Sequence, residues 1–219
     1  MLKIGIIGCG KITEVRHAPE YAENPNCQLV AFFDVVPERA KALAEQYGGV
    51  AYDSIEALLA SDVDAVSVCV ANAYHAQASI QALKAGKHVL CEKPMATTPE
   101  DCEAMVAAAK AAGKFLMIGQ NQRLAKAHVK AREIIASGEM GKVITFETHF
   151  AHPGPEGWTG VRDSWFFDKK VASFGVMADL GVHKTDLIHY LTGKKIVRTS
   201  AVLATLNKTF SDGRPITVD

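Results

Sequence analysis

Hydrophobic and polar positions follow a repeating order from Met1 to about Gln120. Short runs rich in β-branched residues alternate with longer, Ala-rich amphipathic stretches. This order predicts a parallel sheet covered by helices on both faces, because a parallel connection needs a crossover helix. The predicted strands are residues 2–7, 28–34, 65–70, 88–91 and 115–118, with a weaker one at 50–52. The predicted helices are residues 12–23, 37–47, 54–60, 75–85 and 99–112.

The pattern changes after Gln122. It predicts a helix to about 137, a strand at 142–150, an irregular segment to 175 rich in proline, glycine and aromatic residues, a helix at 176–191 and a long strand at 196–206. A polar turn then leads into a short apolar stretch at 216–218. The sequence therefore predicts two domains, residues 1–121 and residues 122–219.

Charge and composition exclude several classes of protein. The 24 basic and 24 acidic residues cancel, so no overall field attracts nucleic acid or an anionic membrane surface. No apolar run approaches the ~18 residues that a membrane-spanning helix needs. The N-terminal apolar run passes directly into glycines without a cleavage site, which predicts a first strand in a cytoplasmic protein. Five widely spaced cysteines indicate small apolar fillers, and neither a disulfide framework nor a metal site is predicted.

A glycine turn follows the first predicted strand. Gly8-Cys9-Gly10 opens the next helix, where backbone N–H groups and the helix dipole can approach a pyrophosphate. Thr13 stands at the third glycine position of the dinucleotide fingerprint, a departure from it. Asp34 ends the second strand, where an acid accepts hydrogen bonds from both ribose hydroxyls and repels a 2′-phosphate. The turn therefore predicts a dinucleotide site, and Asp34 predicts NAD rather than NADP. The alternative for the glycines is a plain strand–helix turn, and the alternative for Asp34 is a strand-end cap.

Two further strand ends carry polar residues. Asn72 and His75 follow one strand, and Glu92-Lys93-Pro94 follows the next. Ligands of doubly wound sheets bind beyond the carboxyl ends of the strands, so these residues are candidates for the same crevice. A cis Lys93–Pro94 bond would aim the ammonium group into that crevice. The alternative for Lys93 is an exposed surface lysine.

The predicted helix at 176–191 carries a polar stripe. Asp179, His183, Asp186 and Tyr190 share one face at α-helical spacing. A carboxylate beside an imidazole raises its pKa and fixes its tautomer, so His183 suits proton transfer. The alternatives are a solvated helix face and a divalent metal on the two aspartates and His183, although one helix face closes a metal site poorly. His149 and His152, near the end of a predicted strand, indicate surface or pocket lining more than a metal site.

These segments together resemble one family. They are 4–12 with His17, Asp34, 72–75, 91–94, 120–123, and 179–183 with Asp186. The chain is similar to the Gfo/Idh/MocA oxidoreductases, the group around glucose–fructose oxidoreductase and inositol dehydrogenase. The resemblance spans nearly the whole chain in order. Its most specific part is Glu-Lys-Pro followed at this distance by Asp-Leu-Gly-Val-His.

The resemblance implies an α/β fold and a reaction. An N-terminal Rossmann domain with a doubly wound parallel sheet precedes an α/β (α+β) domain with an open, mostly antiparallel sheet. The activity it implies is an NAD-dependent dehydrogenase acting on a CH–OH group of a sugar, inositol or related polyol. It implies that Lys93 contacts the reacting hydroxyl and the nicotinamide ribose, Asp179 holds the substrate and His183 is the general acid/base. The expected cofactor-binding residues are Gly8, Cys9, Gly10, Lys11, Ile12, Asp34, Asn72, His75, Glu92, Lys93 and Asn121.

The chain also departs from the family pattern. Ala71 replaces a frequent proline, Ser173-Phe174-Gly175 replaces a glycine-rich run, and family chains continue further, which predicts a truncated second domain. A homo-oligomer is expected if that sheet were complete. The candidate substrate residues are Arg123, His152, Trp158, Arg162 and Trp165. The alternative functions are a nicotinamide-binding regulatory or scaffold protein without catalysis, and a lyase or glycosidase that uses bound NAD transiently.

Overall fold

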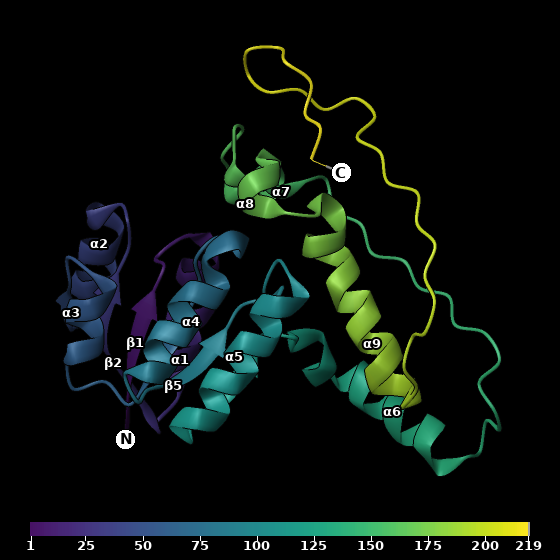
Figure 1. The fold of residues 1–219 in the computed structure, drawn as a ribbon, viewed down its shortest axis with the longest axis horizontal. Helices are drawn as coiled ribbons and strands as arrows, with labels where there is room; N and C mark the ends of the chain where they lie inside the picture. The colour runs from purple at the N-terminus through teal and green to yellow at the C-terminus, as the bar shows by residue number, and fades with distance from the viewer. Residues whose placement is uncertain (219) are drawn as a thin grey trace. The chain divides into compact units, whose positions relative to one another are not determined.

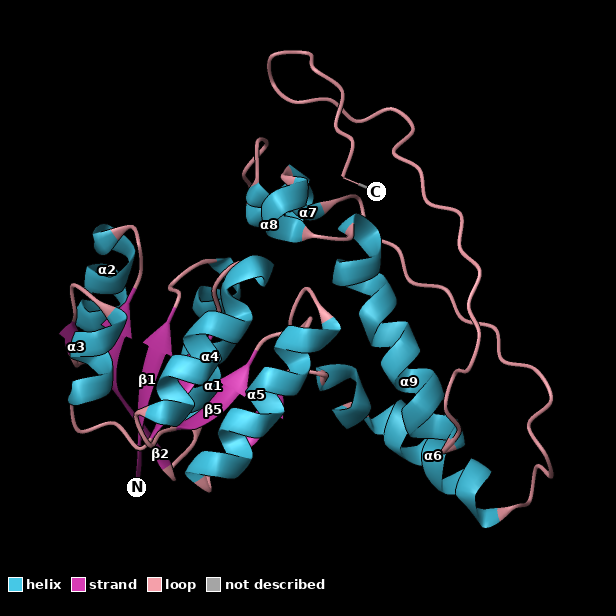
Figure 2. Ribbon diagram, viewed as in Figure 1, coloured by secondary structure: helices cyan, strands magenta, loops and turns pink. Residues whose placement is uncertain are grey.

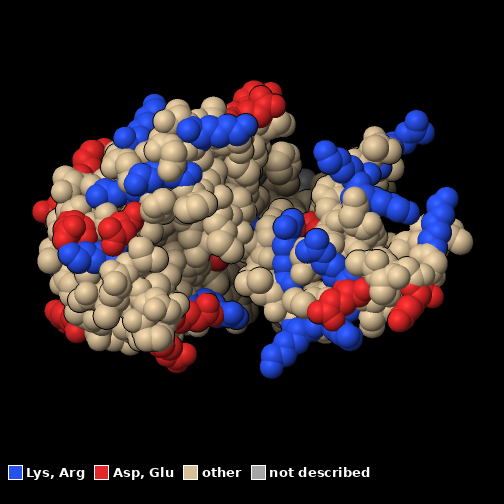
Figure 3. Space-filling view, turned by 90° about the horizontal axis from the view of Figure 1, so that it is seen from below, with Lys and Arg blue, Asp and Glu red and all other residues tan. Residues whose placement is uncertain are grey.

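The computed structural model describes residues 1–218, which form two compact units. The first unit is Met1–Gly119 and the second begins at Gln120. No helix among the described residues is long and apolar enough to span a membrane. Figure 3 shows basic and acidic side chains on the surfaces of both units, in keeping with the equal totals of the two charges.

The first unit is built on a six-stranded sheet in the order β3-β2-β1-β4-β5-β6, with parallel pairing throughout (Figure 1). The strands are β1 Leu2–Ile7, β2 Cys27–Phe33, β3 Val50–Ala51, β4 Ala65–Val68, β5 His88–Cys91 and β6 Leu116–Ile118. All six predicted strands are confirmed, with shifts of one or two residues at some ends. Because the chain order reverses at β1, the carboxyl ends of β1 and β4 flank the point where such sheets bind ligands.

Helices cover this sheet, as the sequence predicts. They are α1 Ala18–Glu23, α2 Pro37–Tyr47, α3 Ile55–Ala60, α4 His75–Lys84 and α5 Pro99–Ala112, and a short 3₁₀ turn, η2 Asn72–Tyr74, precedes α4. The side chains of Ser54 and Thr98 cap α3 and α5 by accepting backbone N–H groups at 3.1 Å. Gly113 ends α5 in the left-handed conformation (φ +63°).

The first helix begins differently from the prediction. Residues Thr13–His17 form a π-helical turn, η1, before α1 continues to Glu23. Pro19 lies in the first turn of α1 and has no N–H to donate to the preceding turn. The wider turn accommodates this missing hydrogen bond, and single π turns of this kind are frequent at functional sites.

Both faces of the sheet are buried. Ile4 and Ile6 of β1 belong to one apolar cluster with Phe32, whereas Ile7 belongs to the other with Leu58. Gly5 permits close approach on the second face, since a Cβ there would lie 2.9 Å from Leu58 Cδ2. Burial on both faces explains the continuous apolar character of the strands.

The second unit is mainly helical where it is regular. Its elements are η3 Asn121–Leu124, α6 Lys126–Ser137, α7 Pro155–Thr159, η4 Trp165–Phe167, α8 Lys169–Ala172, η5 Met177–Gly181 and α9 Val182–Thr192. A small core of Phe167, Ala172, Ile216 and Val218, with Phe210 against it, joins the C-terminal segment to α8. The predicted helix at 176–191 is present, but its first turn is the π turn η5.

The strand predictions for 142–150 and 196–206 are wrong for the structure described. Both segments are loops (Figure 2), and the β pairing in the described part of this unit is an isolated antiparallel bridge between Thr209 and Pro215. Val197 and Val202 are 95% and 97% exposed. An alternating pattern gives a strand only where a neighbouring strand supplies backbone partners, and neither segment has one among the described residues.

Candidate active site

The glycine turn has the shape of a dinucleotide cradle. Gly8 adopts φ +98°, and a Cβ there would lie 2.6 Å from the Cys69 carbonyl oxygen, so the position requires glycine. At Gly10 a Cβ would meet no heavy atom within 4 Å. The space above Gly10 is open, and it lies where the chain enters its first helical turn. The residues present therefore fit a pyrophosphate group.

Thr13 takes over the task of the missing third glycine. Its side chain is fully buried, and Oγ1 donates a hydrogen bond of 2.6 Å to the Gly8 carbonyl oxygen. The hydroxyl therefore ties the first helical turn to the end of β1. The helix and strand are held together by this bond where the fingerprint normally uses the small size of glycine.

Asp34 is fixed beside the turn. Its side chain is 8% exposed, and its two oxygens accept hydrogen bonds from the backbone N–H groups of Cys9 (2.7 Å) and Val36 (2.8 Å). A carboxylate has about four acceptor positions, so two remain for the hydroxyls of a ribose. Arg39 Nη1 lies 3.8 Å from Asp34 Oδ1. The carboxylate therefore fits the predicted ribose contact, with one guanidinium beside it.

Cys9 lies inside the turn rather than on it. Its side chain is fully buried, and burial, followed by the charges of Asp34 and Cys69, raises the pKa of its thiol to about 12. Only the backbone N–H of Cys9 takes part in the turn, through Asp34. Of the neighbouring predicted residues, Lys11 pairs with Glu14 at 3.5 Å, and Ile12 directly precedes η1.

His75, predicted to contact the cofactor, lies buried between two backbone carbonyl groups. Its ring is 1% exposed, with Nδ1 2.6 Å from the Pro94 carbonyl oxygen and Nε2 3.0 Å from the Val70 carbonyl oxygen. Burial lowers the pKa of His75, although both carbonyl groups oppose this effect. A neutral ring has one N–H, so it donates to one of these two carbonyl oxygens at a time; the ring lies between the chain after β4 and the turn after β5. Asn72, also buried, begins the 3₁₀ turn η2 that leads to it.

The turn after β5 carries Glu92 and Lys93, and the Lys93–Pro94 peptide bond is cis. Glu92 Oε1 lies 2.8 Å from His17 Nε2, and Glu92 Oε2 accepts the backbone N–H of Lys93 at 3.1 Å. His17 comes from η1, so this contact joins the glycine-turn helix to the lysine turn. Ser67 and Tyr21 extend the network, and the sequence patterns did not predict either residue.

In the second unit, Asp179 lies in the π turn η5. Its Oδ2 is 3.1 Å from His152 Nε2. The backbone N–H of Gly154 donates to His152 Nδ1 at 2.9 Å, so a neutral His152 carries its proton on Nε2 and donates it to Asp179. The structure thus brings together His152 and Asp179, which the sequence proposed for substrate binding.

His183 stands at the start of α9, one turn after Asp179. Its side chain is 7% exposed, and its ring centroid is 6.0 Å from that of Phe150 at an interplanar angle of 59°. Lys184 Nζ lies 4.8 Å from the same Phe150 ring. An aromatic side chain from the 142–150 segment therefore shields the imidazole.

The predicted polar stripe of α9 divides into two parts. Asp186 forms a two-pronged ion pair with Arg123, whose Nε donates at 2.6 Å. Tyr190 lies under the guanidinium groups of Arg123 (5.4 Å) and Arg132 (4.4 Å). Asp186 and Tyr190, the C-terminal half of the stripe, thus connect α9 to η3 and α6. Arg123 is thus paired with this aspartate, and its substrate contact stays a prediction. No described group of three or more His, Cys, Asp or Glu residues could hold a metal ion.

The remaining predicted substrate residues come from the aromatic segment before α8. Trp165 stacks on Phe166 with ring centroids 3.9 Å apart, and Trp158 meets Phe166 edge-on at 5.9 Å. Both tryptophans remain more than one-third exposed, and Arg162 is exposed. Asn121 is an exposed residue at the start of η3. One indole face of Trp165 is therefore covered by Phe166, while both tryptophans keep part of their surface exposed.

The segment that leads into η5 contains a strained residue. Ser173 has φ +73° and ψ −90°, and it is the residue that the resemblance marks as a departure from a glycine-rich run. A residue with a side chain is strained in this backbone conformation, whereas glycine is not. The strain lies six residues before Asp179.

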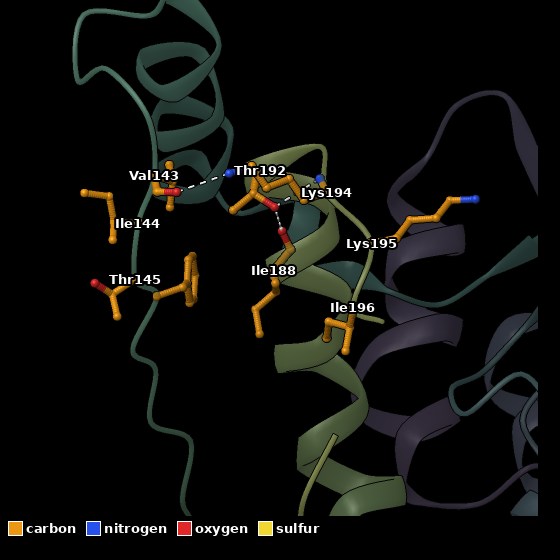
Figure 4. A pocket seen from close by; sticks show the side chains of 9 residues that line it. Val143, Ile144, Thr145, Ile188, Thr192, Lys194, Lys195 and Ile196 are labelled. Atoms are coloured by element: carbon orange, nitrogen blue, oxygen red, sulfur yellow. Dashed lines mark hydrogen bonds between the residues drawn. The ribbon is translucent and has the colours of Figure 1, made fainter. Parts of the chain in front are cut away.

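A separate groove lies between the 143–146 segment and the end of α9 (Figure 4). It has a volume of about 170 Å³ and is lined mainly by Val143, Ile144, Phe146, Ile188 and Ile196. Lys194 Nζ donates to the Val143 carbonyl oxygen at 3.1 Å across it. None of the predicted site residues lines this groove, so it is not the candidate active site.

Comparison with known proteins agrees with the family resemblance. D-glucoside 3-dehydrogenase of Escherichia coli is 36% identical over 201 residues, covering 90% of this chain and 56% of that protein. Myo-inositol 2-dehydrogenase of Thermotoga maritima is 30% identical over 197 residues, covering 89% and 56%. The structure of the 3-ketoreductase KijD10 of Actinomadura kijaniata, in complex with NADP and TDP-benzene, matches with a TM-score of 0.78 and 30% identity, covering 87% and 57%.

The chain thus spans about half the length of the curated relatives it matches. Residues 2–120 match the family model described as "Oxidoreductase family, NAD-binding Rossmann fold", and residues 128–219 match the "GFO/IDH/MocA C-terminal domain". These two matches together cover most of the chain in the order found along it. The chain belongs to the Gfo/Idh/MocA family of oxidoreductases.

Proposed function

We propose that this chain acts as an NAD-dependent dehydrogenase. It would move a hydride between nicotinamide and a secondary hydroxyl of a sugar, inositol or related polyol. The observation that carries the proposal is the open glycine turn with Asp34 beside it, in a chain that also has Lys93, Asp179 and His183. The names of its relatives, which include dehydrogenases of a glucoside and of myo-inositol, support the class of substrate.

The first unit supplies the residues for the cofactor. The turn at Gly8–Gly10 would bind the pyrophosphate, and Asp34 would accept the ribose hydroxyls. NAD supplies a hydride acceptor when it is bound, and the protein supplies position and electrostatics. Asp34 favours NAD, since its carboxylate would repel a 2′-phosphate, whereas Arg39 beside it would attract one. KijD10 binds NADP, so both cofactors belong in the binding test.

Side chains of this chain must accept the proton of the substrate hydroxyl. Oxidation of a carbinol requires the O–H proton to leave as the hydride leaves, which calls for a base and a nearby cation. We assign the base to His183, the cation to Lys93 and substrate binding to Asp179. His152 holds the Asp179 carboxylate in place through its Nε2–H.

The test of the reaction is NADH formation with a panel of glucosides, free sugars and inositols. We expect His183→Ala to lower turnover by about 10²–10⁴-fold, the usual contribution of a general acid or base. His149→Ala is the matched control, because His149 lies in the same unit with its side chain 87% exposed. The proposal fails if the wild type oxidises no member of the panel or if His183→Ala turns over at the wild-type rate.

Two outcomes of this assay separate the alternative functions. Binding of NADH without turnover of any panel member would indicate a regulatory or scaffold protein. Conversion of a glycoside without net NADH would indicate a lyase or glycosidase that uses the cofactor transiently. Both outcomes require NADH binding, which is measured separately by nicotinamide fluorescence.

The cofactor assignment is tested through Asp34. We expect Asp34→Ala to weaken NADH binding by about tenfold, since it removes a charged hydrogen-bond acceptor, and to narrow the preference for NADH over NADPH. Asp53→Ala is the control, because Asp53 is an exposed aspartate of the same unit. Equal loss of binding in both variants would contradict the assignment. If the wild type binds NADPH more tightly, Arg39 outweighs Asp34 and the preference is reversed.

A further inference from the structure

The turn Glu92–Lys93–Pro94 is contacted from two sides by histidine rings, His17, which is partly buried, and His75, which is buried. On one side His17 binds the Glu92 carboxylate, and on the other His75 binds the Pro94 carbonyl oxygen. Lys93 lies between these two anchors, and its own backbone N–H donates to Glu92. Glu92 and Pro94 are therefore contacted by side chains from other elements of the same unit, and Lys93 is held by Glu92 within the turn.

The first anchor is an ion pair with little access to water. The side chains of His17 and Glu92 are 10% and 15% exposed, and their closest atoms are 2.8 Å apart. Burial alone would lower the pKa of His17, but the neighbouring Cys69 and Glu92 side chains outweigh it and raise the pKa to about 10. Burial alone would raise the pKa of Glu92, but His17 and the Lys93 backbone N–H lower it. Both residues are thus charged at neutral pH.

The orientation of the His17 ring is itself fixed. Its Nδ1 lies 3.3 Å from Ser67 Oγ, and Ser67 Oγ lies 2.8 Å from the Tyr21 hydroxyl. Ser67 is fully buried in β4, the strand beside β5. The carboxylate of Glu92 is therefore connected to the centre of the sheet and to α1.

Stability alone does not account for this arrangement. Removing two charges from water is costly, and a buried ion pair is often no more stabilising than apolar residues of the same volume. What such a pair supplies is a defined geometry. Here the geometry is imposed on the residues directly before and after the Lys93 side chain.

We infer that His17 and His75 are positioning residues that clamp the backbone of Lys93, so that its ammonium group extends from a fixed anchor at the end of β5. The inference rests on the proposed function, since it presumes that Lys93 acts on the substrate. It assigns no contact with substrate to either histidine.

The first test measures the clamp without any activity. Amide hydrogen exchange is followed by NMR at Lys93 in the 219-residue chain, for the wild type, His17→Ala and His17→Gln. We expect His17→Ala to speed exchange at Lys93 by about tenfold, the effect of losing about one hydrogen bond. His17→Gln should restore slow exchange, because its amide can still donate to Glu92.

His88→Ala is the matched control. His88 begins the same strand, β5, and accepts the backbone N–H of Phe115 at 3.0 Å, far along the strand from Lys93. This variant also loses a sheet histidine and a hydrogen bond, and it should leave exchange at Lys93 unchanged. Wild-type exchange in His17→Ala, or equally fast exchange in His88→Ala, would overturn the inference.

The second test separates positioning from folding. A misplacement of about 1 Å can cost about 10²-fold in rate, so His17→Ala should lower kcat by about 10–100-fold while the Kd for NADH changes little. His17→Gln should recover most of kcat. The inference is overturned if Lys93→Ala abolishes turnover while His17→Ala keeps the wild-type kcat. If Lys93→Ala itself keeps full turnover, the proposed function fails, whatever the exchange result.

Discussion

Thr13 shows how one side chain can replace the function of a glycine. Its hydroxyl donates to the Gly8 carbonyl oxygen in a fully buried position. The sequence marked Thr13 only as a departure from the fingerprint. A pattern of residue types cannot show a hydrogen bond that forms only after the strand and the helix have met.

We predict that Thr13→Val lowers the free energy of unfolding by about 1–3 kcal/mol, because the nearly isosteric replacement leaves the Gly8 carbonyl oxygen buried without its donor. Thermal or denaturant unfolding measures the change. Thr13→Ser keeps the hydroxyl and should lose less stability. If Thr13→Ser is the less stable of the two, packing of the methyl group matters more than the hydrogen bond.

At Ser173 we predict a substitution that raises the free energy of unfolding. Since its φ is +73°, we expect Ser173→Gly to raise the free energy of unfolding by about 1 kcal/mol through relief of backbone strain. The control is Ser137→Gly at the end of α6, where helical backbone makes glycine unfavourable and stability should fall. Equal effects at both positions would show that Ser173 is not strained.

The partners of His17 and His75 could not be predicted from the sequence. His17 and Glu92 are 75 positions apart in the chain, and neither has a local pattern that predicts the other as its partner. The candidate residues at the strand ends were predictable because parallel strands end at a common edge. Their individual roles depend on tertiary contacts, such as those of the His75 ring near the Pro94 and Val70 carbonyl oxygens.

At the scale of elements, local patterns predicted what local interactions determine. The six strands and the helices of the first unit follow from β-branched runs, capping residues and glycines at helix ends. The π turns η1 and η5 were not predictable, because five residues are too few to distinguish a wider turn from an ordinary one. The sequence predicted one polar stripe at α-helical spacing. In the structure its two parts have different partners, since Asp179 contacts His152 and Asp186 contacts Arg123.

His17, whose pKa is raised by Cys69 and by Glu92, makes stability depend on pH. The pKa of His17 is raised from 6.5 to about 10, so its contribution is full below pH 6.5 and is lost as pH rises through 10. The pKa of Glu92 is lowered from 4.5, so its contribution is full above pH 4.5 and is lost as pH falls below that.

We therefore predict that the stability advantage of the wild type over His17→Gln shrinks as pH rises from 6.5 to 10. Denaturant unfolding at a series of pH values measures it. The His88→Ala variant serves as the control, since its difference from the wild type should not follow this pH course. A constant difference between wild type and His17→Gln across this range would contradict a charged His17.

At the scale of the whole molecule, the two units differ in how much core they hold. The first buries apolar residues on both faces of its sheet, whereas the described buried apolar residues of the second are the small cluster around Phe167 and a few residues of η5 and α9, namely Ala178, Leu180, Leu187 and Leu191. The long segments 142–150 and 196–206 leave residues such as Val197 exposed. Their strand-like pattern predicted a sheet, but neither segment pairs with a strand among the described residues, and this explains the wrong strand predictions.

We predict that residues 1–119, expressed alone, unfold in one cooperative thermal transition and bind NADH with the affinity of the 219-residue chain. Residues 120–219 expressed alone should show a broad, non-cooperative transition, because little apolar surface is buried within that unit. Circular dichroism and nicotinamide fluorescence measure both properties. A cooperative second unit, or a first unit that fails to fold, would contradict this account of where the stability lies.

The depth of Cys9 has a practical consequence. A thiol with a pKa of about 12 forms almost no thiolate at neutral pH, and Cys91 in β5 shares this property. Maleimide dyes and spin labels therefore react first at the partly exposed Cys27 and Cys102. Cys27 begins β2 opposite Leu2, at the other end of β1 from the glycine turn, and Cys102 lies in α5, so labels attached there leave the glycine turn unmodified.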